Sequence, residues 1–132
     1  MRVIVLGAVM AVLSTGVAFA KCNKTPKWPS AAEGEVAATM NVSTGTLCPV
    51  TVRPRPRETF ASATITKQPE NGMARVRGPD RVAYRSNRGY AGPDVFSFTI
   101  KSTIDGKAAE STINVAVTVD RSFPRIRQRL GL

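Results

Sequence analysis

The side chains that could do chemistry in this chain are carboxylates, hydroxyls and arginines, because the sequence contains no histidine. Histidine is the usual general base and a common transition-metal ligand, so its absence removes both functions at once. Glu33 and Glu35 form a near pair of acids around a flexible Gly34, and a Ser-Lys nucleophile pair is conceivable at Lys101-Ser102. Serine and lysine are common on every β-protein surface, so we expect a protein that is not an enzyme and uses no cofactor.

Asp94 is the sharpest candidate for a metal ligand. Calcium prefers about six to eight oxygen ligands, with several carboxylates close together. The other acids that could bind the same calcium ion as Asp94 are isolated in the sequence, at Asp80, Asp105, Glu110 and Asp120. We therefore expect Asp94 to accept backbone amide hydrogen bonds across a turn, with calcium binding as the alternative and no metal site as the prediction.

Arginines dominate the charge of the chain, which has 19 Lys and Arg against 9 acids and a net charge of +10. They fall into three sets: Arg53, Arg55 and Arg57 on a Pro-spaced connector; Arg75, Arg77, Arg81, Arg85 and Arg88 around a predicted hairpin; Arg121, Arg125, Arg127 and Arg129 in the C-terminal tail. Planar guanidinium donors suit phosphates, sulfates and carboxylates, so sets that converge in space would contact an anion or a partner. The alternative is a solvated basic face that keeps an exported protein soluble.

The N-terminus has the pattern of a cleaved export signal. One positive charge at Arg2 precedes the apolar run 3–13, and Ala18-Phe19-Ala20 supplies the small-x-small pattern that signal peptidase recognises. The run is too short to cross a bilayer core of about 30 Å, so residues 1–20 are predicted to be a signal peptide, with no transmembrane segment after its removal. The mature chain would begin at Lys21 in the periplasm or outside the cell, and loss of Arg2 lowers the net charge from +10 to +9.

Cys22 and Cys48 are the two cysteines of the chain, and both belong to the mature part. In an oxidising compartment a disulfide between them is the simplest expectation, and it would stabilise the fold by about 3.5 kcal/mol in the chain-entropy model. A reactive thiol pair would need a Cys-x-x-Cys spacing or a neighbouring activating base, and neither is visible. Trp28 is expected to cover the disulfide region.

The elements that must position these residues are β-strands. Apolar residues alternate with polar ones over 36–42, 48–52, 61–65, 74–76, 82–84, 96–100 and 113–119. This is the period-two pattern of strands with one face in a core, and turn signals such as Asn71-Gly72 and Asp105-Gly106 separate them. The prolines of 53–57 favour a polyproline-II connector. About seven strands without a helical period predict an all-β antiparallel sandwich over residues 34–120, between a flexible basic leading segment (21–33) and a basic tail (121–132).

A Gly-rich corner runs directly into the strongest of these strands. It is made of Gly89, Tyr90, Gly92, Asp94, Phe96 and Phe98. Gly89 and Gly92 are expected to supply backbone angles that a side chain would forbid, while Phe96 and Phe98 share the buried face of the strand. We predict a structural role for this corner.

These residues resemble a known family. The run Lys67-Gln68-Pro69-Glu70-Asn71-Gly72, the strand Val82-Ala83-Tyr84, the Gly-Tyr-x-Gly-x-Asp-x-Phe motif at 89–96 and the final alternating Val strand resemble bacterial Ig-like and cadherin-like repeat domains of large surface proteins. The resemblance covers about residues 60–119, in a single copy. It implies an Ig-like β-sandwich used for adhesion, spacing or partner docking, usually without catalysis.

The sequence therefore predicts an exported, non-catalytic module that docks a protein partner in the periplasm or at the cell surface. The alternative is a cationic binder of anionic envelope components, such as lipopolysaccharide or acidic polysaccharide. Nucleic acid is not expected, because export removes access to it and the aromatic side chains that stack on bases are missing. In the tail, Phe123, Ile126 and Leu130 could share one face of a cationic membrane-surface helix, and a frayed tail is the competing expectation.

Overall fold

The computed structural model describes residues 20–121. Residues 1–19 of the predicted signal peptide lie outside this range, as do the tail residues Arg125, Arg127 and Arg129 and the pattern through Phe123, Ile126 and Leu130. Within the described range, no helix has the length and hydropathy needed to cross a membrane.

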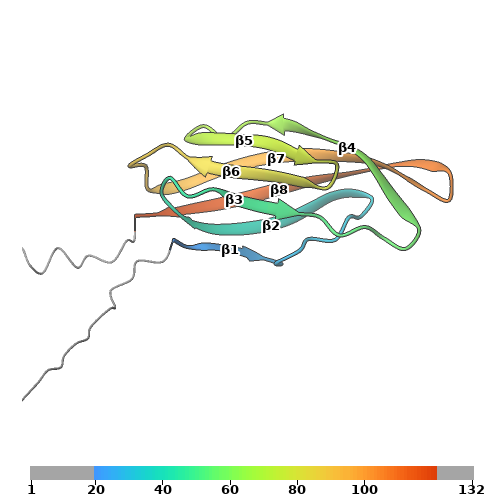
Figure 1. Ribbon diagram of the computed structural model, residues 1–132, viewed down its shortest axis with the longest axis horizontal. Helices are drawn as coiled ribbons and strands as arrows, with labels where there is room; N and C mark the ends of the chain where they lie inside the picture. Colours follow the sequence, from blue (N-terminus) through green and yellow to red (C-terminus); the bar gives the residue numbers. More distant parts are fainter. Residues whose placement is uncertain (1–19, 122–132) are drawn as a thin grey trace, which may run out of the picture. The chain divides into compact units, whose positions relative to one another are not determined.

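The described chain forms eight β-strands in two sheets that pack as a sandwich (Figure 1). In chain order they are β1 (Cys22–Thr25), β2 (Gly34–Ser43), β3 (Cys48–Thr51), β4 (Glu58–Lys67), β5 (Gly72–Gly78), β6 (Arg81–Ser86), β7 (Gly92–Ile104) and β8 (Lys107–Asp120). One sheet has the order β1-β2-β8-β7-β4, and the other has the order β3-β6-β5. The predicted all-β sandwich is confirmed.

Two features of the strand arrangement differ from the prediction. The pair β2–β8 is parallel over ten residues of each strand, whereas the other strand pairs are antiparallel. In addition, β1 lies in the leading segment expected to be flexible, where Cys22–Thr25 pairs with Thr39–Val42 of β2. Asn23 and Thr25 of β1 are exposed, so this edge strand shows little of the apolar alternation that marks the others.

The core is built from the apolar residues that alternate along the strands. The largest fully buried side chains of β2, β6, β7 and β8 are Met40, Val42, Val82, Tyr84, Phe96, Phe98, Ile100, Ile113 and Val115. Val76 was expected to face this core and is instead 42% exposed. The pairing of β5 with β6 shifts between Val76 and Gly78, and such a bulge bends a strand away from regular alternation.

A disulfide between Cys22 and Cys48 joins β1 to β3 and therefore links the two sheets, with a Cα–Cα distance of 5.5 Å. Trp28 was expected to cover this region, and its ring lies at the protein surface. Trp28 is 51% exposed, and Pro29 takes the buried position at this point of the chain. The cationic groups of Lys27 and Arg53 lie 5.2 and 5.6 Å from the centroid of the Trp28 ring.

The corner before β7 is held by Asp94. Its carboxylate accepts hydrogen bonds from the backbone amides of Glu70 (3.1 Å), Asn71 (3.2 Å) and Val95 (3.0 Å), and from the hydroxyl of Tyr84 (2.8 Å). The carboxylate thus ties β7 of one sheet to β6 and the β4–β5 turn. Burial, reinforced by the bond to Asp94, raises the pKa of Tyr84, which keeps this hydroxyl a donor.

Gly89 and Gly92 bring the chain into this corner with φ angles of +83° and +137°. Both angles fall in a region that side chains disfavour. The Tyr90 hydroxyl donates a hydrogen bond to the Pro93 carbonyl, and the Tyr84 ring stacks on Phe96 with ring centroids 5.4 Å apart. The corner is therefore a packed and hydrogen-bonded turn.

Candidate functional site

The connector arginines are each engaged with a neighbour. The Arg55 guanidinium binds both carboxylate oxygens of Glu58, each at 2.9 Å, and Ser102 donates its hydroxyl to the same carboxylate. The Glu58 side chain is fully buried, and its hydrogen bonds to Arg55 are the main cause that lowers its pKa from 4.5 to about 2. Arg55 therefore neutralises a buried acid at the start of β4 and is not a free contact residue.

Arg57 and Arg53 are also occupied. Arg57 lies 3.1 Å from Asp105 in an exposed ion pair between the connector and the β7–β8 turn. Arg53 sits over the Trp28 ring, and its backbone bonds to Pro29 and Ala31 across the chain. The connector set thus serves local structure at three separate places.

Three arginines of the hairpin set share one surface hollow of about 460 Å³. Its lining consists of Leu47, Met73, Arg75, Val76, Arg77, Ala83 and Arg85. Arg75 and Arg85 lie on the face of the three-stranded sheet opposite to the core residues Ala74 and Tyr84, because successive side chains of a strand point to opposite faces. We call this feature the arginine hollow; most of its residues belong to β5 and β6, the strands labelled in the upper part of Figure 1.

The pairing of β5 with β6 explains why these side chains meet. Arg75 is opposite Ala83, and Met73 is opposite Arg85, so that cationic and apolar side chains alternate across the two strands. Ala83 is 3% exposed and lies among the larger side chains of the lining. Leu47 and Met73 remain 42% and 49% exposed, so the hollow has an apolar rim beside its charges.

No carboxylate of residues 20–121 forms an ion pair with the charges of the arginine hollow. Its lining contains no acidic residue. Among residues 20–121, the ion pairs that the structure forms are Lys21–Asp120, Arg55–Glu58 and Arg57–Asp105, and these involve no arginine of the hollow. Three guanidinium groups therefore face solvent without an internal carboxylate.

The other candidate arginines do not line the hollow. Arg81 pairs with Thr51 at the far end of β6, Arg88 is exposed in the turn after β6, and Arg121 is the last described residue. The sequence therefore predicted Arg75, Arg77 and Arg85 as contact residues but not the apolar rim. The alternation Met73-x-Arg75-x-Arg77 on one strand face was the signal for Met73.

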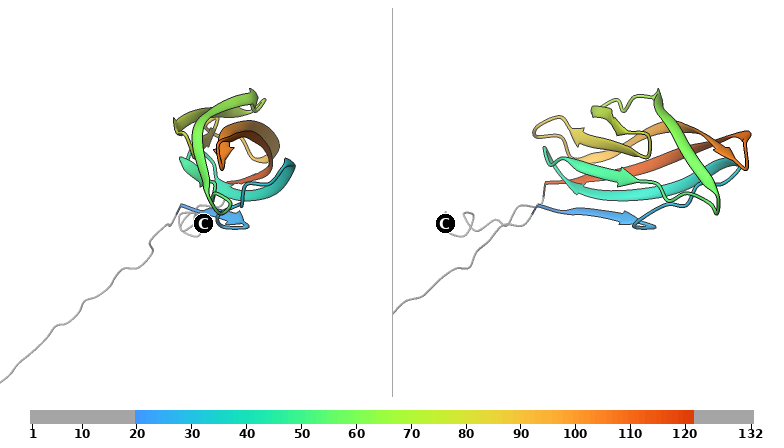
Figure 2. Two further views of the ribbon diagram at one scale, coloured as in Figure 1. Left: turned by 90° about the vertical axis from the view of Figure 1, so that its right-hand side faces the viewer. Right: turned by 45° about the vertical axis from the view of Figure 1, so that its right-hand side comes forward.

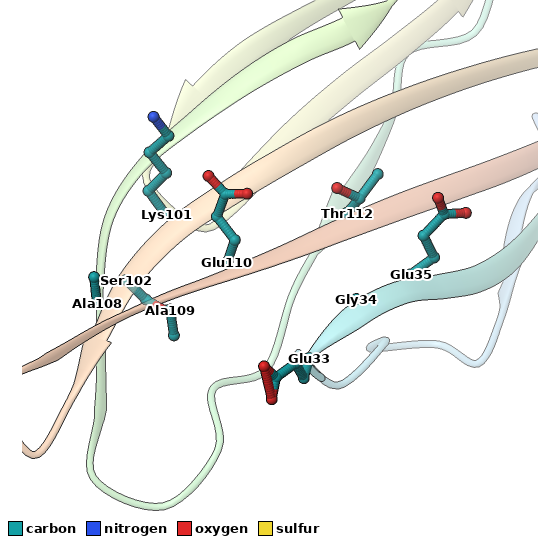
Figure 3. Close-up of a pocket in the computed structure, with 9 residues that line it drawn as sticks. All are labelled: Glu33, Gly34, Glu35, Lys101, Ser102, Ala108, Ala109, Glu110 and Thr112. Atoms are coloured by element: carbon teal, nitrogen blue, oxygen red, sulfur yellow. The ribbon is translucent and has the colours of Figure 1, made fainter.

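A second hollow, of about 750 Å³, contains the acids and the Ser-Lys dipeptide considered above (Figure 3). Lys101 is exposed beside Glu110 of the neighbouring strand, whereas the buried Ser102 donates its hydroxyl to Glu58. Consecutive residues of β7 point to opposite faces, so Lys101 cannot activate Ser102. Glu33 and Glu35 point in different directions, and among the described residues no three acids or cysteines gather as a metal site.

A disulfide and two side chains cover parts of the sheet edges. On one side, the disulfide links β1 to β3, and the Lys24 ammonium donates to the Pro49 carbonyl at 2.8 Å. On the other side, the amide of Gln68 bonds to both the backbone N–H and the carbonyl of Ala74 on β5, each at 3.1 Å. The end-on view in Figure 2 shows the strands wrapped around a common interior.

A family model described as bacterial Ig domain matches residues 29–118, which is more than half of the chain. The match begins before β2 and ends within β8, so it includes strands of both sheets and reaches further towards the N-terminus than the resemblance expected over 60–119. No curated protein matches the chain.

Proposed function

Because the chain belongs to the bacterial Ig domain family, we propose that it is an extracytoplasmic, non-catalytic module that docks an acidic protein partner through the arginine hollow. Domains of this family are generally non-catalytic. The disulfide between Cys22 and Cys48 supports a location in an oxidising compartment, as does the export pattern of residues 1–20.

The observation that carries this proposal is the set of three unpaired guanidinium groups around an apolar rim. Arginine and methionine are both enriched at protein interfaces, and arginine binds carboxylates through two parallel hydrogen bonds. A polysaccharide would satisfy the charges of Arg75, Arg77 and Arg85 but would leave Leu47 and Met73 in water. An acidic protein surface with an apolar side chain would match both, so the hollow would be the anchor of a larger interface.

Site-specific crosslinking in the native compartment tests this proposal. A photoreactive residue at Met73 should capture a partner, whereas one at Thr118, which is exposed on the five-stranded sheet, should not. The double substitution Arg77→Glu and Arg85→Glu should lower capture at least about tenfold, because each arginine contact becomes a repulsion. Lys107→Glu on the β7–β8 turn is the control for reversing a charge elsewhere on the surface.

Two results would contradict the proposal. The first is capture at Met73 that persists after both arginines are reversed. The second is equal capture at Met73 and Thr118, which would mean that the partner has no preference for the hollow.

A polyanion of the cell envelope is the second candidate, and the surroundings of Trp28 favour it. Lys27 and Arg53 both lie over this exposed ring, and Lys24 has a lowered pKa, first through burial and then through the charge of Lys27. Two cations thus lie over one aromatic ring, and a third lies close enough to Lys27 to feel its charge. Retention on a heparin or lipopolysaccharide column should fall steeply with salt and should weaken when Lys27 and Arg53 are changed to alanine; elution at low salt would exclude it.

A further inference from the structure

Lys21, the residue predicted to become the mature N-terminus, is held by the folded domain at its backbone and at its side chain. Its backbone N–H donates to the Ser43 hydroxyl at 2.8 Å, and its carbonyl accepts from the Ser43 N–H at 3.0 Å. Its ammonium group lies 2.9 Å from the Asp120 carboxylate. Ser43 on β2 and Asp120 on β8 are direct partners in the sheet, so Lys21 is bound where these two strands end.

Removal of the signal peptide would change the chemistry of the atom that contacts Ser43. Hydrolysis of the Ala20–Lys21 bond adds the hydroxyl of water to the Ala20 carbonyl carbon and a proton to the Lys21 nitrogen, which takes a second proton from solvent. A neutral amide with one proton becomes an ammonium group with three protons and a positive charge. The Ser43 hydroxyl is already in place to accept from it, and the Asp120 carboxylate binds the same residue.

We infer that the α-ammonium group of Lys21, a residue whose side chain pairs with Asp120, is a built-in structural ligand of the mature domain, docked at the Ser43 hydroxyl, and that signal-peptide cleavage precedes closure of β1. This inference rests on the export that is part of the proposed function. Ser43 is fully buried, so the hydroxyl that receives the new amine belongs to the packed fold. The site would recognise one ligand, the freshly cut N-terminus of this chain.

The order of events follows from the distance between the cleavage site and the fold. Lys21 alone separates the Ala20–Lys21 bond from Cys22, where β1 and the disulfide begin. Proteases act on exposed and flexible backbone, but in the folded domain both backbone polar groups of Lys21 are bonded to Ser43. The bond is therefore accessible before β1 pairs with β2 and protected afterwards.

The first test compares two mature proteins that differ only at the N-terminus. One begins at Lys21, and the other keeps a Gly-Ala extension, so that position 21 is an amide. A folded state that stabilises the ammonium form gives stability that is present below about pH 7.7 and lost as the pH rises through the folded-state pKa. The charged groups at this end of the domain are the ion pair of the Lys21 side chain with Asp120 on β8 and Arg121, which follows Asp120 in the sequence; β2 contributes the uncharged Ser43.

The folding equilibrium constant of the Lys21 form should fall about tenfold between pH 6 and pH 9 relative to the extended form. Asp120→Asn should reduce this difference. Asp105→Asn, the same change at the opposite end of β8, should leave it intact. Parallel pH curves for the two forms would overturn the inference.

The second test addresses the order of cleavage and folding. Signal peptidase should cleave the reduced Cys22→Ser precursor at least about tenfold faster than the oxidised, folded precursor. Equal rates would overturn the order. N-terminal sequencing of the exported protein separates the two proposals. An uncut chain would contradict both the proposed export and this inference. A first residue other than Lys21, or a Lys21 start with parallel pH curves, would contradict only this inference.

Discussion

Asp94 shows how a carboxylate that could bind a cation is used instead to hold a turn. Four protein donors approach its two oxygens, from Glu70, Asn71, Val95 and Tyr84. A calcium ion needs several carboxylates around it, and these oxygens already have their partners. The sequence indicated this role from the isolation of Asp94, but it could not reveal the donors from Glu70, Asn71 and Tyr84, which come from other strands or turns.

We expect Asp94→Asn to lower the free energy of unfolding by about 2–4 kcal/mol, because the new amide group turns a donor towards existing donors. Urea denaturation measures this loss. Tyr84→Phe removes one of the four hydrogen bonds and should cost about 1 kcal/mol. If added calcium stabilised the unmodified protein and EDTA reversed it, the structural role assigned to Asp94 would be wrong.

Glu58 gives the fold a dependence on acid. Its pKa is lowered from 4.5 to about 2, chiefly by the bonds to Arg55. Because the folded-state pKa lies below the unfolded one, the stabilisation is complete above about pH 4.5 and is lost as the pH falls towards 2. The shift corresponds to at most about 3 to 4 kcal/mol.

Urea midpoints between about pH 2 and pH 6 should therefore fall more for the natural protein than for Glu58→Gln, which cannot ionise. The comparison isolates this residue from the other acids, which titrate in both proteins. If the urea midpoints of the two proteins fell equally with decreasing pH, the Arg55–Glu58 pair would not be the cause of the loss of stability in acid.

At the scale of elements, the alternation of apolar residues predicted seven of the strands and nearly all of the core, since burial of one strand face leaves a period-two pattern. It could not predict that β2 and β8 run parallel, because alternation is the same in both directions. It also missed β1, whose outward residues are polar, and the bulge that exposes Val76.

The candidate site was predictable to a similar degree. Arg75, Arg77 and Arg85 were among the arginines predicted as contacts because they lie around one hairpin, and the structure places them in the lining of one hollow. Their convergence depends on the register of β5 with β6. Arg57 is not available as a contact residue because it pairs with Asp105, which lies in a turn far away in the sequence. Neither pairing leaves a local pattern.

Gln68 is a side chain that completes a sheet edge. Its amide replaces a partner strand at the buried Ala74, donating to the carbonyl and accepting from the N–H. We expect Gln68→Ala to lower the free energy of unfolding by about 1–3 kcal/mol and to promote association through the freed edge. Thermal denaturation and light scattering measure both effects, with the exposed Thr66→Ala as control. A variant as stable and monomeric as the control would show that this edge needs no cover.

At the scale of the whole molecule, the two outer faces differ in charge. The outward side chains at the centre of the five-stranded sheet are small and uncharged, as in the pairs Ser97–Asn114 and Thr99–Thr112, which bond across β7 and β8. The three-stranded sheet carries the arginine hollow. Three guanidinium groups are therefore gathered on one outer face, which would favour one orientation of approach by the acidic partner proposed above.

The disulfide is the covalent link between these two sheets. Replacing Cys22 and Cys48 with serine should lower the free energy of unfolding by about 3–4 kcal/mol in the chain-entropy model. Hydrogen exchange should rise first in β1, which pairs only with β2. If β1 stayed as protected as β8 in this variant, the bridge would not be what holds it.

Lys21 and Asp120 lie in contact although 99 positions separate them, so the described domain starts and finishes at the same end (Figure 1). In a tandem array of domains, the N-terminus and C-terminus of each domain usually lie at opposite ends, so that tension passes through its whole length. Because its two ends are adjacent, this domain would project sideways from any longer chain that contained it. Tension applied at its two ends would separate β1 from β2 starting at the first residue of the domain. The disulfide of Cys22 would resist this separation from the second residue onwards.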